Sequence, residues 1–225
     1  MSDFLGSTSA AASVALLLIG AGMTIAVSAV SILLGFVIAV PVCIARLSRF
    51  RVGRWTGGVY VSFFRGVPLL VQLLVIYYAL PSVGLELPSF FAAALGLAVC
   101  TAAYQAENLR GGFLVIPAGQ VAAARAFGYR GAQIWRHILL PQALRASAPA
   151  IVNEMIAILK ASSLVSVVGV ADLTRVSQNI VARDLKPIQW YGLAALIYLV
   201  ISLGVAALGR GSERRLGRGG LAAAL

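Results

Sequence analysis

Residues 119–141 read GQVAAARAFGYRGAQIWRHILLP and form a long polar interruption in a chain otherwise made of apolar runs. The stretch carries three arginines and the only histidine, so we expect it to lie in water rather than within a membrane. Its alanine-rich start, Gly128 and the closing Pro141 favour two short helices joined by a turn at 128–131. On spacing alone, such an insertion serves either as a loop held at lipid headgroups or as a docking site for another protein.

The composition around this stretch is that of a membrane protein. Apolar residues make up 60% of the 225 residues, charged residues only 11%, and the mean hydropathy is +0.95. A span needs about 20 apolar residues to cross the bilayer. The chain therefore reads as one all-α membrane domain over 1–225, with about five spans and an external amphipathic helix at 170–185. The expected spans are 13–45, 59–80, 90–109, 147–168 and 188–208.

The distribution of basic residues predicts an orientation. Fourteen of the 18 Lys and Arg residues fall on the side of the 119–141 loop, and three fall on the other side. Loops on the cytoplasmic side of a membrane carry the excess of basic residues. We therefore expect the loop and the C-terminus to be cytoplasmic and the N-terminus external.

Other function classes receive little support from the sequence. The net charge of +11 comes from arginines in short loops, which sets orientation and does not indicate nucleic-acid binding. Cys43 and Cys100 lie in apolar runs without CxxC spacing, so neither a disulfide nor a metal site is expected. A membrane-embedded hydrolase would need a paired nucleophile and base at membrane depth, and the single histidine, His137, lies in the polar loop.

The polar loop resembles the cytoplasmic coupling loop of permease subunits in bacterial ABC importers. That pattern is Glu-Ala-Ala, three residues, Gly, nine residues, Ile, one residue and Leu-Pro. This chain matches it at Ala123, Ala124, Gly128, Ile138, Leu140 and Pro141, and departs at Ala122, where the family has Glu. The resemblance implies that these seven residues dock an ATPase, and the departure at Ala122 puts the strength or the choice of that partner in question.

The resemblance extends from about residue 20 to 200 and is to the polar amino acid uptake family, which includes histidine, glutamine and arginine permeases. It is carried by the order and spacing of Arg65-Gly66-Val67-Pro68, Ala103-Tyr104, Glu107, Pro141-Gln142-Ala143-Leu144-Arg145, Asn153-Glu154 and Ser162-Ser163-Leu164. It implies the type I ABC importer permease fold, in the bacterial inner membrane. It also implies a second permease subunit, identical or paralogous, an external substrate-binding protein and a cytoplasmic ABC ATPase dimer. ATP and Mg are expected on that ATPase, because this sequence contains no GxxxxGK[ST] phosphate loop.

Four residues are candidates for contacting the substrate. Ionisable groups inside a membrane are costly and mark pathways or pairs. Glu154 lies within the fourth span and corresponds to a Glu that lines an amino acid site in some family members, although it could instead pair with a basic residue. Ala161 stands where the family commonly has Asp, which predicts a neutral or acidic substrate rather than a dibasic one. Cys100 stands where the family often has Asn, and Glu107 could either face substrate or pair with Arg110 at i+3.

Two further cations within the apolar runs have open roles. Arg65 is expected at headgroup level at the start of a helix. Lys160 could extend to the interface, pair with Glu154, or cap backbone carbonyls. The rival functions are import of opines or other small solutes by a related ABC permease, and an ATP-independent secondary carrier, for which no internal repeat is evident.

Overall fold

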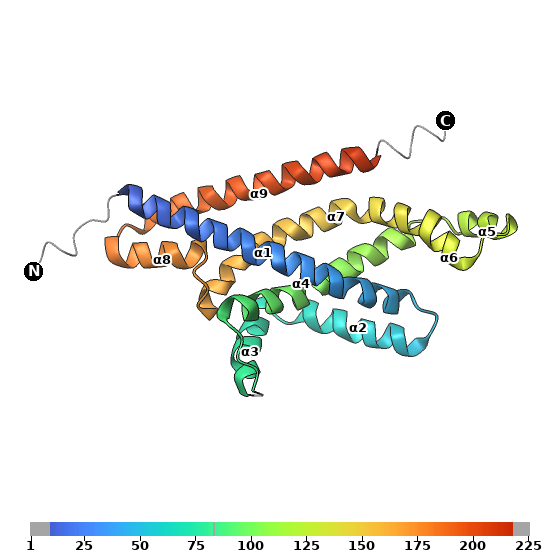
Figure 1. Ribbon diagram of the computed structural model, residues 1–225, viewed down its shortest axis with the longest axis horizontal. Helices are drawn as coiled ribbons and strands as arrows, with labels where there is room; N and C mark the ends of the chain where they lie inside the picture. Colours follow the sequence, from blue (N-terminus) through green and yellow to red (C-terminus); the bar gives the residue numbers. More distant parts are fainter. Residues whose placement is uncertain (1–9, 83, 218–225) are drawn as a thin grey trace, which may run out of the picture.

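The computed structural model describes residues 10–82 and 84–217, and every regular element in these ranges is a helix. Long helices run along one common axis (Figure 1). They are α1 (Ala10–Leu47), α4 (Ser89–Leu114), α7 (Leu140–Ala161) and α9 (Pro187–Gly217). By length and hydropathy, these elements supply 4 candidate spans, or up to 5 if the bent helix pair after α1 counts as one. The start of α1 and the end of α9 lie at opposite ends of the bundle, as an odd number of crossings requires.

Helix α4 lies at the centre of the bundle because small residues let its neighbours approach closely. A Cβ at Gly35 of α1 would lie 2.3 Å from Cγ2 of Thr101 on α4. Small residues at helix contacts are the usual means of packing in membranes, where burying apolar surface against another helix gains little over lipid. The same α1–α4 contact contains one buried cluster of mostly small residues: Ala39, Cys43, Ala102, Ala106 and Leu109.

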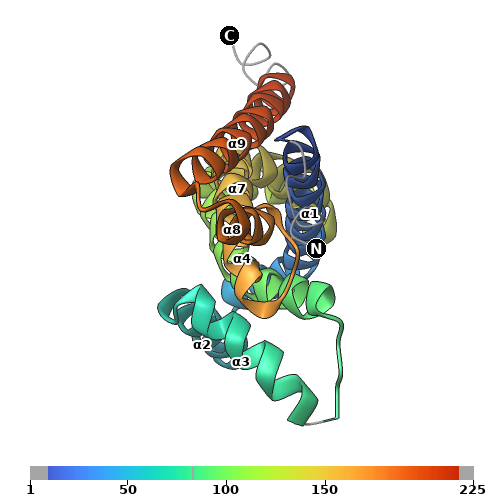
Figure 2. The same ribbon diagram turned by 90° about the vertical axis from the view of Figure 1, so that its left-hand side faces the viewer.

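The expected second span, 59–80, is not one helix. The structure has α2 (Arg51–Gly66) and α3 (Leu69–Ser82), which meet at 104°. Pro68 explains the break, since proline lacks a backbone donor and forces the preceding Val67 into its extended conformation. The buried Gln72 side chain donates to the carbonyl oxygens of Phe64 and Val67 at 2.9 and 2.8 Å. These bonds satisfy carbonyls that the break leaves without helical partners. Figure 2 shows the α2–α3 pair projecting from one side of the bundle.

Helix α8 (Leu173–Asp184) lies at the end of the bundle that is remote from the polar loop (Figure 1). Its cap residue Asp172 is fully buried and accepts hydrogen bonds from the backbone N–H groups of Thr174 and Arg175 at 3.1 and 3.0 Å. The Tyr198 hydroxyl of α9 lies 3.3 Å from the same carboxylate. Burial raises the pKa of Asp172, although these hydrogen bonds act in the opposite direction. The carboxylate therefore holds α8 and α9 together at a desolvation cost.

Candidate functional site

The candidate substrate site is built around Glu154 on α7. Its side chain is half-buried against α4, and its Oε1 accepts a hydrogen bond from Thr101 Oγ1 at 3.1 Å. Thr101 is itself fully buried, so it holds the carboxylate in one place. In the part of the chain that the structure describes, Glu154 forms no ion pair within 4.0 Å. A carboxylate that is fixed but not neutralised can accept a cationic group of a ligand.

Arg65 lies over the face of an aromatic ring on α4, and its expected place at headgroup level stays a prediction. It sits at the end of α2 remote from the α1–α2 turn, with its guanidinium carbon 5.0 Å from the centroid of the Tyr104 ring on α4. A cation on an aromatic face keeps its hydrogen-bond donors free for another partner. Sequence spacing could not reveal this contact, because Arg65 and Tyr104 lie on different helices.

A buried amide extends the polar face of α4 beyond Thr101. The Gln105 side chain donates to Thr101 Oγ1 at 3.4 Å, and its own carbonyl oxygen, Oε1, is buried with no hydrogen-bond partner among the described residues. One turn further along, Asn108 donates to the backbone oxygen of Ala150 on α7 at 3.3 Å. Polar groups thus continue along α4 from Thr101 toward its contact with Ala150 of α7.

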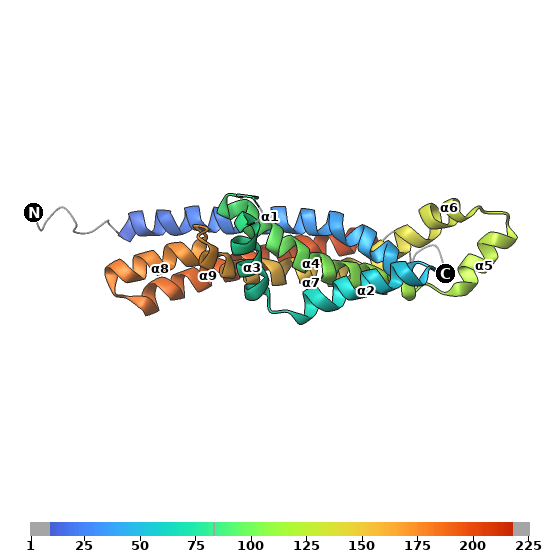
Figure 3. The same cartoon turned by 90° about the horizontal axis from the view of Figure 1, so that it is seen from below.

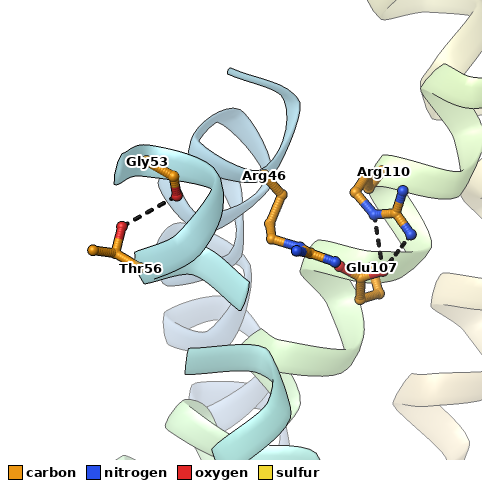
Figure 4. Close-up of polar contacts among 5 residues, drawn as sticks. All are labelled: Arg46, Gly53, Thr56, Glu107 and Arg110. Atoms are coloured by element: carbon orange, nitrogen blue, oxygen red, sulfur yellow. Dashed lines mark hydrogen bonds and ion pairs between the residues drawn. The ribbon is translucent and has the colours of Figure 1, made fainter. Parts of the chain in front are cut away.

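Glu107 has a different environment from Glu154. One carboxylate oxygen is 3.0 Å from Nε of Arg46 on α1, and the other is 2.7 Å from Arg110 (Figure 4). The predicted i+3 pair with Arg110 is present, and Arg46 is a partner that sequence spacing could not reveal. Both carboxylate oxygens are occupied, so Glu107 links α1 to α4 and is not free to receive substrate.

Cys100 and Ala161 take positions at the edge of the site. The buried Cys100 thiol points to the backbone oxygen of Phe64 at 3.8 Å, so it packs against the end of α2. Ala161 is the last residue of α7 and is half-buried, two turns from Glu154 on the same helical face. Lys160 is exposed and lines a groove of about 550 Å³ between α7 and α9. It makes no ion pair within the described residues, so of the three alternatives for Lys160 the pairing with Glu154 is not seen there.

The polar loop extends beyond the other helices at one end of the bundle (Figure 3). It contains α5 (Ala118–Ala126) and α6 (Gly131–Ile134), with Gly128 in the left-handed conformation at φ 79° between them. Only Ala124 and Ile134 of the two short helices are buried. Among the family-pattern positions, Ala122, Ala123 and Leu140 are exposed, whereas Ile138 and Pro141 are half-buried.

An aromatic residue at the loop tip was missed by the sequence reasoning. Phe127 is 84% exposed and precedes the Gly128 turn, and Tyr129 on the other side of that turn is also exposed. An apolar ring this accessible in a polar loop is typical of an anchor residue at a protein interface. The sequence feature that could have identified Phe127 is its position next to the turn residue Gly128.

The loop and Glu154 belong to one continuous helical segment. From α6 the chain passes through a π-helical turn (Trp135–Leu139) directly into α7, and residues Gly131–Val168 register as a single candidate span. Trp135 packs on Phe113 of α4 with ring centroids 4.8 Å apart. π-Helical turns occur frequently at functional sites. The part of the loop from Gly131 onward and Glu154 therefore lie on one helical segment.

The comparisons with known proteins agree with this arrangement. Residues 31–218 match the family described as binding-protein-dependent transport system inner membrane component. The chain is 35% identical to the arginine transport system permease protein ArtQ of Bacillus subtilis strain 168, covering 88% of this chain and 90% of that one. It is 38% identical to the nopaline transport system permease protein NocM of Agrobacterium fabrum strain C58, covering 82% and 81%.

A solved structure matches with a TM-score of 0.83 and 35% identity, covering 90% of this chain and 94% of the other. That structure is a crystal structure of an amino acid ABC transporter with histidines. The expected fold class and the family resemblance are therefore confirmed, and the protein is a multi-pass membrane component.

Proposed function

Since the chain belongs to the family of binding-protein-dependent transport system inner membrane components, we propose that it is the permease subunit of an ATP-driven importer for a polar amino acid. The observation that supports this most directly is the single helical segment joining an exposed loop to an intramembrane carboxylate. The arginine permease and the amino acid transporter among its relatives favour an amino acid as substrate. The subunit makes and breaks no bond in the substrate.

We propose that the site binds the zwitterionic part of an amino acid. The Glu154 carboxylate would receive the α-ammonium group, and the Arg65 guanidinium on Tyr104 would receive the α-carboxylate. Both are charge-assisted hydrogen bonds, which are stronger than neutral ones. Thr101 keeps Glu154 oriented in the absence of substrate.

The partners follow from the same arrangement. The exposed face of 119–141, with Phe127 at its tip, would dock a cytoplasmic ABC ATPase dimer that binds ATP and Mg. A substrate-binding protein would deliver the amino acid at the opposite end, near α8, where the start of α1 would be external. A second permease subunit, identical or paralogous, would complete the central cavity. In this orientation the end of α9 is cytoplasmic.

Uptake measurements test the proposal. Cells lacking this chain should lose ATP-dependent uptake of one member of a panel of radiolabelled polar amino acids, and the restored chain should recover it. Glu154→Gln should weaken uptake roughly 10- to 100-fold, since a hydrogen bond to a charged group contributes about 1.5–3 kcal/mol. Glu86→Gln, which changes an exposed carboxylate outside the site, is the matched control. Uptake that continues without ATP and stops when the ion gradient collapses would instead identify a secondary carrier.

Import of an opine is the second candidate. The nopaline permease is as similar to this chain as the arginine permease is. Including nopaline and octopine in the uptake panel separates the two substrates. Loss of opine uptake alone after deletion would establish the second candidate.

A further inference from the structure

The turn between α1 and α2 carries a basic cluster with exposed apolar side chains. Arg49, Arg51 and Arg54 fall within six residues, and Phe50 is exposed between the first two. A hollow at the start of α2 is lined by Arg51, Val52, Arg54 and Trp55. The first backbone N–H groups of α2 receive no side-chain cap from the N-cap residue Phe50.

These positive charges are not neutralised by the protein. The sequence contains no Asp or Glu between Asp3 and Glu86. Within the described residues, neither Arg49 nor Arg51 forms an ion pair. Among the described residues, the Arg54 guanidinium donates to the backbone oxygens of Ser48 and Arg49, at 3.2 and 3.3 Å, which holds it at the turn without cancelling its charge. The cluster is therefore available to an anionic partner from outside the chain.

An apolar stripe leads from this cluster along α2. Val52, Trp55, Val59 and Phe63 lie on one face by helical spacing and are between 50% and 74% exposed. The opposite face packs on the end of α1, where a Cβ at Gly57 would lie 3.1 Å from Arg46 Cγ. The stripe is thus turned away from the bundle, and it runs about 16 Å along the helix at 1.5 Å per residue. That length is about half the thickness of a roughly 30 Å hydrocarbon layer, which is the thickness of one leaflet.

We propose that the α1–α2 turn and the outer face of α2 form a binding site for one anionic phospholipid. The phosphate binds the Arg49–Arg51–Arg54 cluster, and an acyl chain lies along the stripe from Val52 to Phe63. Trp55 lies between the phosphate site and the acyl-chain stripe, and amphipathic Trp rings are enriched at this level of a membrane. That the leaflet is the cytoplasmic one follows from the orientation proposed above, whereas the site itself does not depend on transport.

Native mass spectrometry of the purified complex, titrated with phosphatidylglycerol or phosphatidylcholine, tests the headgroup site. The parent chain should retain phosphatidylglycerol in preference. Arg49→Gln with Arg51→Gln should weaken this binding about 30-fold, because each arginine near an anionic surface contributes about a factor of five. Arg175→Gln with Lys186→Gln removes two exposed charges near the opposite end and should leave binding unchanged.

Replacing Trp55 by a photo-reactive phenylalanine analogue tests the acyl-chain face by crosslinking. Amino acid uptake by the same cells reports separately on the transport proposal. A lipid adduct supports the site, whereas an adduct to a second permease chain assigns this face to a protein interface and overturns it. Equal retention of the two lipids by the parent, or no loss in the double arginine variant, also overturns it. These outcomes stand whether or not the transported substrate is an amino acid.

Discussion

Replacing Gly112 by alanine tests the closest approach between α4 and α7. A Cβ at this position would lie 2.4 Å from the backbone oxygen of Ala143 and 3.1 Å from Cβ of Ser147. The obstructing oxygen belongs to a helix backbone and also accepts the Ser147 hydroxyl at 2.9 Å, so it cannot move alone. Overpacking of this kind costs about 1–3 kcal/mol, against a gain of up to about 1 kcal/mol from replacing a helical glycine. We expect a net loss of about 1–2 kcal/mol.

The neighbouring Gly111→Ala variant is a matched control, because its Cβ would meet no atom within 4 Å. For a chain of this size, a change of 1 kcal/mol shifts Tm by about 2–4 °C. Tryptophan-fluorescence melting of the purified complex should therefore place Gly112→Ala about 2–8 °C below the parent and Gly111→Ala at or above it. Equal Tm values for the two variants would refute the close α4–α7 contact.

Three further substitutions address other contacts. Glu107→Gln leaves Arg46 and Arg110 without their counter-charge and should lower the free energy of unfolding, in the same melting assay, by about 1–3 kcal/mol. This value lies between those for exposed and buried ion pairs. Adding Arg46→Gln should recover part of the loss, and no recovery would contradict the Arg46–Glu107–Arg110 contact. Burial raises the pKa of Asp172, so its contribution to stability is present below the unfolded pKa of about 3.9 and is lost as pH rises through the folded pKa. Asp172→Asn keeps a side chain that can cap α8. In melting curves from about pH 4 upward, the Tm of this variant should depend less on pH than the Tm of the parent. An equal pH dependence of Tm would exclude Asp172 as its source. Ala161→Asp should shift uptake toward dibasic amino acids, and an unchanged substrate preference in a competition assay would show that this position does not sense charge.

The sequence predicted the elements that depend on local patterns. Apolar runs of sufficient length marked the long helices, and the left-handed glycine required at Gly128 marked the turn of the loop. The helical spacing after residue 169 likewise marked α8. Each of these signals lies within one window of sequence, so a single chain is enough to recognise it.

The contacts that shape the site could not be predicted in this way. Arg46 meets Glu107 across 61 residues, and Thr101 meets Glu154 across 53. The break at Pro68 was visible in the sequence, but the 104° angle depends on Gln72 folding back onto the carbonyls of α2.

The same contact that Gly112 permits also suggests how the loop and the site are coupled. Ala143 lies about 18 Å along the helical segment from Gly131 in the loop, and about 16 Å from Glu154 in the other direction, at 1.5 Å per residue. The contact with α4 at Ala143 therefore divides the segment into two arms of nearly equal length. Pro149, inside α7, removes one backbone hydrogen bond between Ala143 and Glu154 and makes that arm the easier one to bend. If α4 provides this support, Gly112→Ala should reduce uptake by more than its loss of stability accounts for. Uptake per folded complex equal to the parent's would show that the loop moves Glu154 without a support at Ala143.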